Sequence, residues 1–215
     1  MRNLKFYFFL ILITIGCSKK NDKLEIFLLK ERMPFSDGIS IDNIETTSQE
    51  AYIQKQKWIK LNIKSDTINN QLIFVGKFKA SAKDLQLQPL ITDDEIISFN
   101  VKTSELEIHK SGFEKLIKLD RTNTENGIGI QFALCINGAP KIFGYLYNYS
   151  YFVTYLPSTY CISYKTNVED KNQNSMILRF NDFIPNSDGQ TNMRMLDSIR
   201  EKEMFIALKN SKRLK

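Results

Sequence analysis

Residues 106–143 read LEIHKSGFEKLIKLDRTNTENGIGIQFALCINGAPKIF, and the order of patterns in this stretch decides the expected fold. Leu106–His109 alternates between apolar and polar residues, as a half-buried strand does. Ser111 is a suitable N-cap for a helix that reaches about Leu119. The apolar residues of this helix recur with i, i+3, i+4 spacing, at Phe113, Leu116 and Ile117. We therefore predict a strand followed by a helix with one apolar face.

The second half of the stretch predicts a hairpin. Ile128–Ile136 is mostly apolar, which is typical of a buried strand. Asn137-Gly138 is a strong two-residue hairpin signal, and the return strand includes Ile142 and Phe143. Together the two halves predict a βαββ unit in which one face of the helix covers a sheet.

Outside this unit the chain shows further strand and helix patterns. Strands are expected at Leu24–Leu29, Trp58–Ile63, Gln71–Lys79, Ile96–Val101, Thr159–Lys165 and Ser175–Phe180. A short helix is expected at Thr47–Lys57, and Thr92 followed by three acids favours a helix start. After a turn at Asp188-Gly189, we expect Thr191 to cap a C-terminal helix. Its inner face would hold Met195, Leu196 and Ile199. The sequence predicts the α+β class, with a mixed or antiparallel sheet.

The N-terminus has the parts of an export signal. Basic residues precede an apolar run from Phe6 to Ile15, which is too short to span a bilayer, and Gly16-Cys17 follows. This arrangement resembles the bacterial lipobox, in which a cysteine is lipidated before the signal is cut, although Thr14 stands where leucine is usual. We expect a signal peptide at 1–16, a polar tether at 17–23 and a single domain at 24–215. An uncleaved anchor, or a secreted protein with a free Cys17, is the alternative.

Composition excludes several classes of protein and partner. The chain has 215 residues, of which 42% are hydrophobic, so it can bury a core and is not a disordered chain. Removing residues 1–16 lowers the formal net charge from +6 to +4. This modest excess forms no dense basic patch, so nucleic acid is not an expected partner. Lys19, Lys20 and Lys23 are expected to hold the tether near anionic headgroups.

With Cys17 lipidated, two cysteines remain, Cys135 and Cys161. An exported protein can form a disulfide between them, provided that their Cα atoms lie about 4.4–6.8 Å apart. Two buried free thiols that pack as small apolar groups are the other interpretation. The sequence alone leaves both open.

Four tyrosines alternate strictly, at Tyr145, Tyr147, Tyr149 and Tyr151. On an extended strand their rings share one face over about 20 Å. Such a row either packs in the core or forms a platform that stacks on sugar rings or grips a peptide. The opposite face mixes polar and apolar residues, so the tyrosine face is predicted to be the buried one.

The sequence predicts no catalytic residue, no metal site and no cofactor. His109 is the only histidine, which excludes a multi-histidine metal site, and we expect it to be structural or solvated. There is no Gly-x-Ser-x-Gly motif for a nucleophilic serine. Asp93-Asp94 stands at an expected helix start, where acids usually serve as caps.

The βαββ unit and its surroundings also show a family likeness. It is carried by Pro89-Leu90-Ile91-Thr92, Leu106-Glu107-Ile108, Ser111–Leu116, Asn126-Gly127-Ile128 and Phe132–Pro140. In this order they resemble the first periplasmic domain of the SecD subunit of the bacterial export machinery, over about residues 24–30 and 89–143. The resemblance implies an α+β head domain outside the cytoplasmic membrane that touches other polypeptides. SecD works through transmembrane helices, which this chain lacks, so its proton-driven export is not implied.

We therefore expect an exported lipoprotein, anchored to a bacterial membrane through Cys17. Its body would act without catalysis as a protein-interaction or scaffold module in the cell envelope. The alternative is a glycan- or peptidoglycan-binding lipoprotein that uses the tyrosine face, and a hydrolase is a distant third.

Overall fold

The computed structural model describes residues 22–40, 67–69, 71–122, 129–148, 160–164, 174–185, 191–196, 198–199 and 201–215. Several sequence predictions lie outside these residues: the signal peptide and Cys17, the helix at 47–57, the strand at 58–63, Tyr149, Tyr151 and the turn at 188–189.

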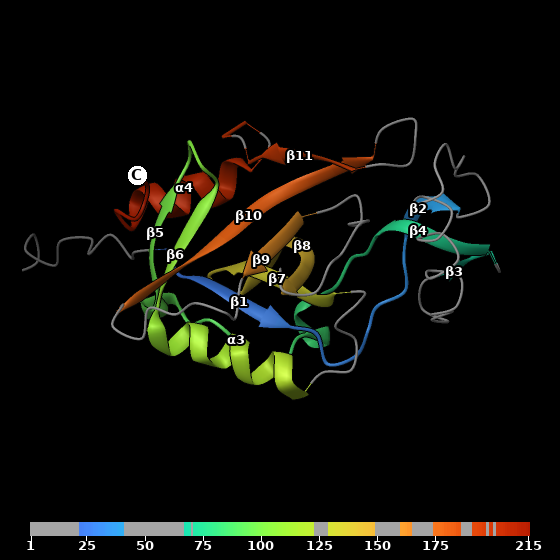
Figure 1. Cartoon of the computed structure of the whole chain (residues 1–215), viewed down its shortest axis with the longest axis horizontal. Coiled ribbons are helices and arrows are strands. Elements are labelled where there is room, and N and C mark those ends of the chain that lie inside the picture. The colour runs from blue at the N-terminus through green and yellow to red at the C-terminus, as the bar shows by residue number, and fades with distance from the viewer. Residues whose placement is uncertain are drawn as a thin grey trace, which may run out of the picture.

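A large mixed sheet forms the body of the protein (Figure 1). Its strands are β1 (Leu24–Leu28), β5 (Ile96–Asn100), β6 (Glu105–His109), β7 (Ile130–Ile136), β8 (Ala139–Asn148), β9 (Tyr160–Tyr164), β10 (Ser175–Pro185) and β11 (Thr191–Met195). The strand order is β1-β7-β8-β9-β10-β6-β5, and β11 also pairs with β10. All neighbours are antiparallel except β8 and β9, which are parallel.

The remaining elements are a second, smaller sheet and the helices. The small sheet has the order β2 (Asp37–Ser40), β4 (Gln71–Lys77) and β3 (Thr67–Ile68). The helices are α3 (Lys110–Thr122) and α4 (Lys202–Asn210), with short 3₁₀ turns η3 (Ala82–Asp84) and η4 (Asp93–Glu95). A mixed sheet with helices packed against it confirms the predicted α+β class.

The strand, helix and hairpin predicted from residues 106–143 are all present, but α3 begins at Lys110, so Ser111 lies inside the helix and does not cap it. Asn137 and Gly138 have φ values of 52° and 78°, the left-handed conformation that a tight two-residue hairpin requires. However, α3 connects β6 to β7, and these two strands are separated in the sheet by β8, β9 and β10. The predicted βαββ segment is therefore spread across the whole sheet instead of forming a compact unit of its own.

Both helices contribute to the larger of two hydrophobic clusters, which covers one face of the sheet. On α3, Phe113 and Leu116 are buried, which confirms the apolar face predicted for this helix. On α4, Phe205 meets Phe99 of β5 edge to face, with ring centroids 5.9 Å apart. Burying such residues is the main source of stability in a sheet of this kind.

The smaller cluster covers the opposite face of β7, β8 and β9. Ala133 and Tyr145 come from these strands, while Phe35, Ile73 and Phe78 come from the connecting chain and the small sheet. Because β7 and β8 are buried on both faces, they read as almost continuous apolar runs in the sequence.

Two local predictions are wrong. Residues Thr191–Met195 form β11 instead of a helix, and the C-terminal helix is α4, which begins at Lys202. Thr191 continues a hairpin, because β10 extends to Pro185 and main-chain pairing with β10 outweighs the helix-cap preference of one threonine. Ile199, expected on the inner face of the helix, is 89% exposed. Asp37 and Gly38, residue types that suit a turn, are the first two residues of β2.

The outer edges of β1 and β5 are covered by the chain itself. The segment 84–91 lies along β1, where the Gln86 amide donates to the Leu28 carbonyl at 2.9 Å. The C-terminal residues 213–215 lie along β5, and the Phe99 amide donates to the Arg213 carbonyl at 2.8 Å. Such coverage blocks the edge-to-edge pairing that exposed strands invite.

Candidate functional site

The structure places the two described tyrosines of the stripe in the protein core. Tyr145 is 0% exposed and Tyr147 is 3% exposed. Phe78 packs against the edge of the Tyr145 ring at 5.4 Å, and the Arg32 guanidinium lies 5.6 Å from the centroid of the same ring. These two rings are covered by protein, so they present no open stacking surface.

Cys135 and Cys161 are buried free thiols, so the disulfide left open by the sequence does not form. Cys135 lies on β7 and Cys161 on β9, with β8 between them. In the register of the sheet, Cys161 on β9 pairs with Tyr145 on β8, and Tyr145 pairs with Gln131 on β7. Gln131 is four residues away from Cys135 along β7. Two strand spacings and four residues separate the Cα atoms by about 16 Å, far beyond disulfide reach. Burial raises the pKa of Cys135 to about 11 and that of Cys161 well above its usual value, so neither is a ready thiolate.

The ionisable residues show no catalytic arrangement among the described ranges. His109 is exposed at the end of β6. Within these ranges no three His, Cys, Asp or Glu side chains gather in a way that would hold a metal ion. Acidic caps were expected at Asp93-Asp94, but the acid that caps this turn is Glu95. Its Oε2 accepts a hydrogen bond from the Thr92 amide at 2.9 Å.

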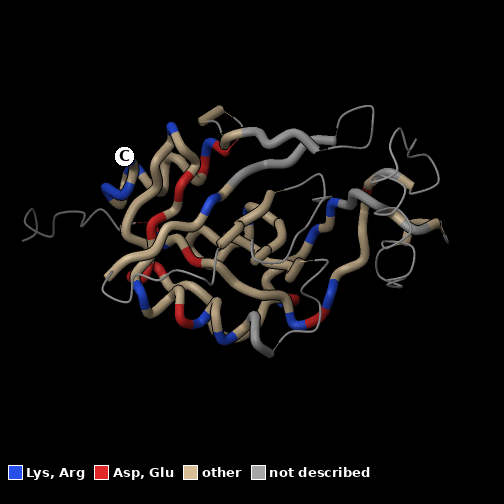
Figure 2. Tube along the Cα trace, viewed as in Figure 1, with Lys and Arg blue, Asp and Glu red and all other residues tan. Residues whose placement is uncertain are grey.

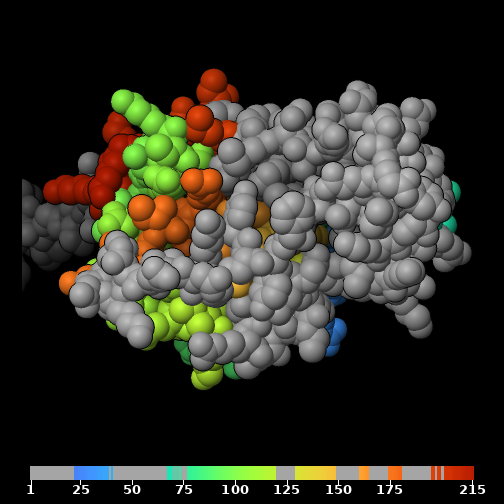
Figure 3. All heavy atoms as spheres, in the orientation of Figure 1, coloured from blue at the N-terminus to red at the C-terminus, as the bar shows by residue number. Residues whose placement is uncertain are grey.

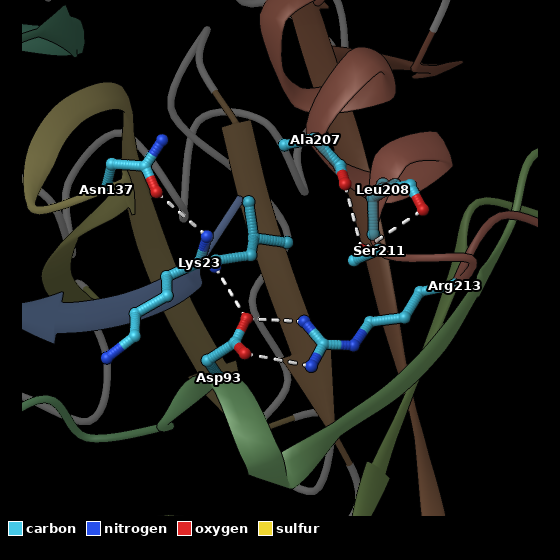
Figure 4. Close-up of polar contacts among 8 residues, drawn as sticks. Lys23, Asp93, Asn137, Ala207, Leu208, Ser211 and Arg213 are labelled. Atoms are coloured by element: carbon cyan, nitrogen blue, oxygen red, sulfur yellow. Dashed lines mark hydrogen bonds and ion pairs between the residues drawn. The ribbon is translucent and has the colours of Figure 1, made fainter. Parts of the chain in front are cut away.

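A polar cluster fixes the point where the described chain enters the fold; we call this region the tether end (Figure 4). The Lys23 amide donates to Asn137 Oδ1 at 3.0 Å in the β7–β8 turn. Asp22 accepts from Asn137 Nδ2 at 2.9 Å and from Asn210 Nδ2, at the end of α4, at 2.8 Å. The start of β1, the hairpin turn and the C-terminal helix therefore meet at the tether end.

Asp93 connects the C-terminal segment to the tether end through Arg213. One of its carboxylate oxygens accepts from the Leu24 amide at 2.7 Å, and its two oxygens accept from the two terminal nitrogens of Arg213. Burial tends to raise the pKa of Asp93, but the hydrogen bonds with Arg213 and the Leu24 amide outweigh it, so the pKa is lowered. This bidentate pair draws together residues next to β1, β5 and α4 (Figure 4).

The half of the sheet formed by β5, β6 and β10 carries a different kind of surface on the side away from the helices. We call it the open face. It comprises Glu105, Glu107, Ser175, Ile177, Arg179 and Met195, which share one side by strand register, and the buried Ser98 lies on the same side beneath Glu107. On β10, Met176, Leu178 and Phe180 are buried, whereas Ile177 is 58% exposed. Figure 3 shows the β5–β6 hairpin (green) and β10 (orange) side by side at the surface.

Glu107 organises the polar part of the open face. It accepts hydrogen bonds from Lys215 at 2.9 Å, from Ser98 at 2.8 Å and from Ser175 at 2.9 Å. These hydrogen bonds, that of Lys215 first, lower the pKa of Glu107 to about 2. Every partner donates to this carboxylate, so Glu107 is held as an anion and is not a candidate general acid near neutral pH. The open face thus combines a fixed ionic network with the exposed apolar side chains of Ile177 and Met195.

Comparison with known proteins gives no relative: no family model, no curated protein and no solved structure matches the chain. Of the helices in the described part of the chain, none is long and apolar enough to cross a membrane.

The sequence reasoning overlooked the open face and the pairing of Asp93 with Arg213. In the strand predicted at Ser175–Phe180, the exposed Ile177 alternates with the buried Met176 and Leu178. That alternation predicts one outward face. By contrast, nothing local marks Asp93 and Arg213, which lie 120 residues apart in the sequence.

Proposed function

We propose that this protein is exported, is held at a bacterial membrane by a lipid on Cys17, and binds another envelope protein without catalysing a reaction. The observation that carries the proposal is the open face, where Ile177 and Met195 are 58% and 52% exposed on the same side of the sheet. Apolar patches rimmed by polar residues mark protein interaction sites, and we assign that role to the surface that carries Ile177 and Met195.

The composition of the open face favours a protein partner over a glycan. Methionine and arginine are enriched at protein interfaces. Arg179 is the next residue after Ile177 on the same side of β10, and Met195 lies opposite Asn181, further along that strand. Glycan binding usually relies on aromatic rings open to solvent, but Tyr145 and Tyr147 are buried. The likeness of residues 89–143 to the SecD head domain, which touches other polypeptides, agrees with this choice.

The manner of binding follows from the edges of the sheet. Residues 84–91 and 213–215 occupy the outer edges of β1 and β5, so a partner strand cannot be added there without displacing them. We therefore propose contact through side chains of the open face. Ile177 supplies the apolar anchor, and Arg179 and Glu105, which are opposite one another on β10 and β6, supply charge.

The anchor is tested by replacing Cys17 with serine. The variant should leave the membrane fraction or accumulate as an unprocessed chain, because serine cannot take the thioether-linked lipid. Mass spectrometry of the wild-type protein should show a lipid on Cys17. A variant that is processed and retained at the membrane like the wild type would contradict the lipoprotein assignment.

The interaction surface is tested by placing a photo-crosslinking amino acid at Ile177, at Met195 or at Leu87 in living cells. Leu87 is the matched control, because it is 89% exposed but lies on the segment that covers β1. We expect one adduct of the same mass from Ile177 and Met195, and its absence from Leu87. Arg179→Glu should weaken that adduct. Indistinguishable patterns at all three positions would refute a partner on the open face.

A further inference from the structure

The tether end has a defined position relative to the proposed lipid. Cys17 and Asp22 are five residues apart, so their Cα atoms are separated by at most about 18 Å even when the chain is fully extended. Asp22 is held to the fold by Asn137 and Asn210. If Cys17 is lipidated, the tether end cannot move farther than this from the headgroups.

Basic side chains are concentrated at the tether end. Lys23, next to Asp22, is exposed, and so are Lys209 and Lys212 at the end of α4. Figure 2 shows Lys and Arg positions gathered near the C-terminus. The tether adds Lys19 and Lys20 in sequence.

The acidic side chains of this region are mostly neutralised by partners within the fold. Asp93 is paired with Arg213, and Glu203 on α4 is paired with Lys141 at 2.7 Å. Asp22 remains as an anion, because hydrogen bonds from Asn137 and Asn210 lower its pKa. Asp22 and the exposed Asp94, next to Asp93, are the carboxylates to set against the three exposed lysines, so the surface is net positive.

The end of α4 does not cancel this charge. A helix C-terminus carries partial negative charge on its last carbonyl groups. Here Ser211 Oγ donates to the carbonyls of Ala207 and Leu208 at 2.9 and 3.1 Å, and the Arg213 amide donates to that of Leu208 at 2.8 Å (Figure 4). These carbonyls are therefore satisfied by the chain itself, and Lys209 and Lys212 are exposed.

We propose that the tether end binds anionic lipid headgroups and so orients the domain on the membrane. The inference rests on the proposed anchor at Cys17. The lipid chain would hold the tether end near the membrane, and the cluster of lysines would add electrostatic attraction to anionic headgroups. This attraction acts only within a screening length of about 8–10 Å. Each lysine near an anionic surface contributes about fivefold to partitioning. Lys209 and Lys212 together should therefore contribute about thirty-fold.

The test uses the full protein, extracted from membranes and reconstituted into vesicles of phosphatidylglycerol and phosphatidylcholine, or of phosphatidylcholine alone. A fluorophore is attached to Ala139→Cys, in the hairpin at the tether end, or to Asp37→Cys in the small sheet. Both native positions are exposed, and Cys135 and Cys161 are buried. We expect headgroup-located quenchers to quench the label at position 139 more strongly than at 37, and only in anionic vesicles. High salt should abolish the difference.

Charge variants decide whether the lysines are responsible. Lys209→Gln with Lys212→Gln should remove the quenching difference, whereas Lys77→Gln with Lys79→Gln, at exposed positions near the small sheet, should preserve it. Equal quenching at 139 and 37 in a lipidated protein would overturn the inference while the anchor stands. If mass spectrometry shows no lipid on Cys17, the proposed anchor fails instead. In that case, flotation with anionic vesicles tests whether the tether end binds headgroups without an anchor. Lys209→Gln with Lys212→Gln should then lower partitioning into the vesicles about thirty-fold, and a smaller effect would overturn the inference.

Discussion

Replacing Glu95 with glutamine tests how the 3₁₀ turn before β5 is joined to α3. The Glu95 side chain is only 8% exposed. Besides the Thr92 amide, it accepts from Ser111 Oγ at 2.9 Å and from Lys115 Nζ at 2.7 Å. Glutamine has nearly the same size, but it carries no negative charge to pair with Lys115. An NH₂ group in the place of Oε2 would also face the Thr92 amide and the Lys115 ammonium, neither of which can accept a hydrogen bond. We therefore expect Glu95→Gln to destabilise the protein without changing its fold.

The magnitude follows from the pKa of Glu95. Burial tends to raise this pKa, but the hydrogen bonds from Lys115, Thr92 and Ser111 outweigh it and lower the pKa from 4.5 to about 2. A tenfold change in proton affinity corresponds to about 1.4 kcal/mol. Ionised Glu95 should therefore stabilise the fold by about 3 kcal/mol near neutral pH. Because the folded pKa is depressed, this stabilisation is complete above about pH 4.5 and is lost as the pH falls toward 2.

The assay is urea denaturation of wild type and Glu95→Gln at pH 7 and at pH 3. The difference in free energy of unfolding should be about 3 kcal/mol at pH 7 and should shrink to about 1.5 kcal/mol at pH 3. Glu114→Gln, at an exposed position on α3, is the matched control and should change stability little at either pH. A difference that does not depend on pH, or one no larger than that of the control, would refute this account of the Glu95 contacts.

Three further predictions concern the core. Leu116→Ala should lower the free energy of unfolding by about 2–5 kcal/mol, because the side chain is fully buried, and a urea midpoint that barely moves would contradict the packing of α3. Tyr147→Ala should cost a similar amount. A fold unmoved by this change, together with saturable glycan binding by the wild type, would favour the glycan-binding alternative. Cys135 and Cys161 should resist alkylation at pH 8 until denaturant is added, as followed by intact mass, and fast labelling of the native protein would disprove their burial.

Elements marked by short-range signals were predictable from the sequence. The spacing of Phe113 and Leu116 indicated α3, and Asn137-Gly138 indicated the hairpin, because both signals depend on residues close in the chain. The tyrosine alternation correctly predicted a shared face for Tyr145 and Tyr147. It could not predict that the opposite face of β8 is also buried, because that face packs in the larger hydrophobic cluster, whose residues come from distant parts of the chain.

Features created by distant contacts were not predictable in this way. The parallel pairing of β8 with β9 depends on the path of the chain between them, and no local pattern encodes it. Likewise, no local pattern shows that residues 213–215 pair with β5. The same reasoning explains the error at Thr191, where a good helix cap is also a good strand residue and pairing with β10 decides.

The C-terminal segment links the two surfaces on which the proposals rest. Arg213 is fixed to Asp93 at the tether end, while Lys215, two residues later, reaches Glu107 on the open face at 2.9 Å. Two residues span at most about 7 Å, so the open face begins close to the surface expected to meet the headgroups. A partner bound at Ile177 would then itself lie near the membrane. The crosslinked protein should therefore be membrane-associated, and a partner confined to the soluble fraction would speak against the combined arrangement.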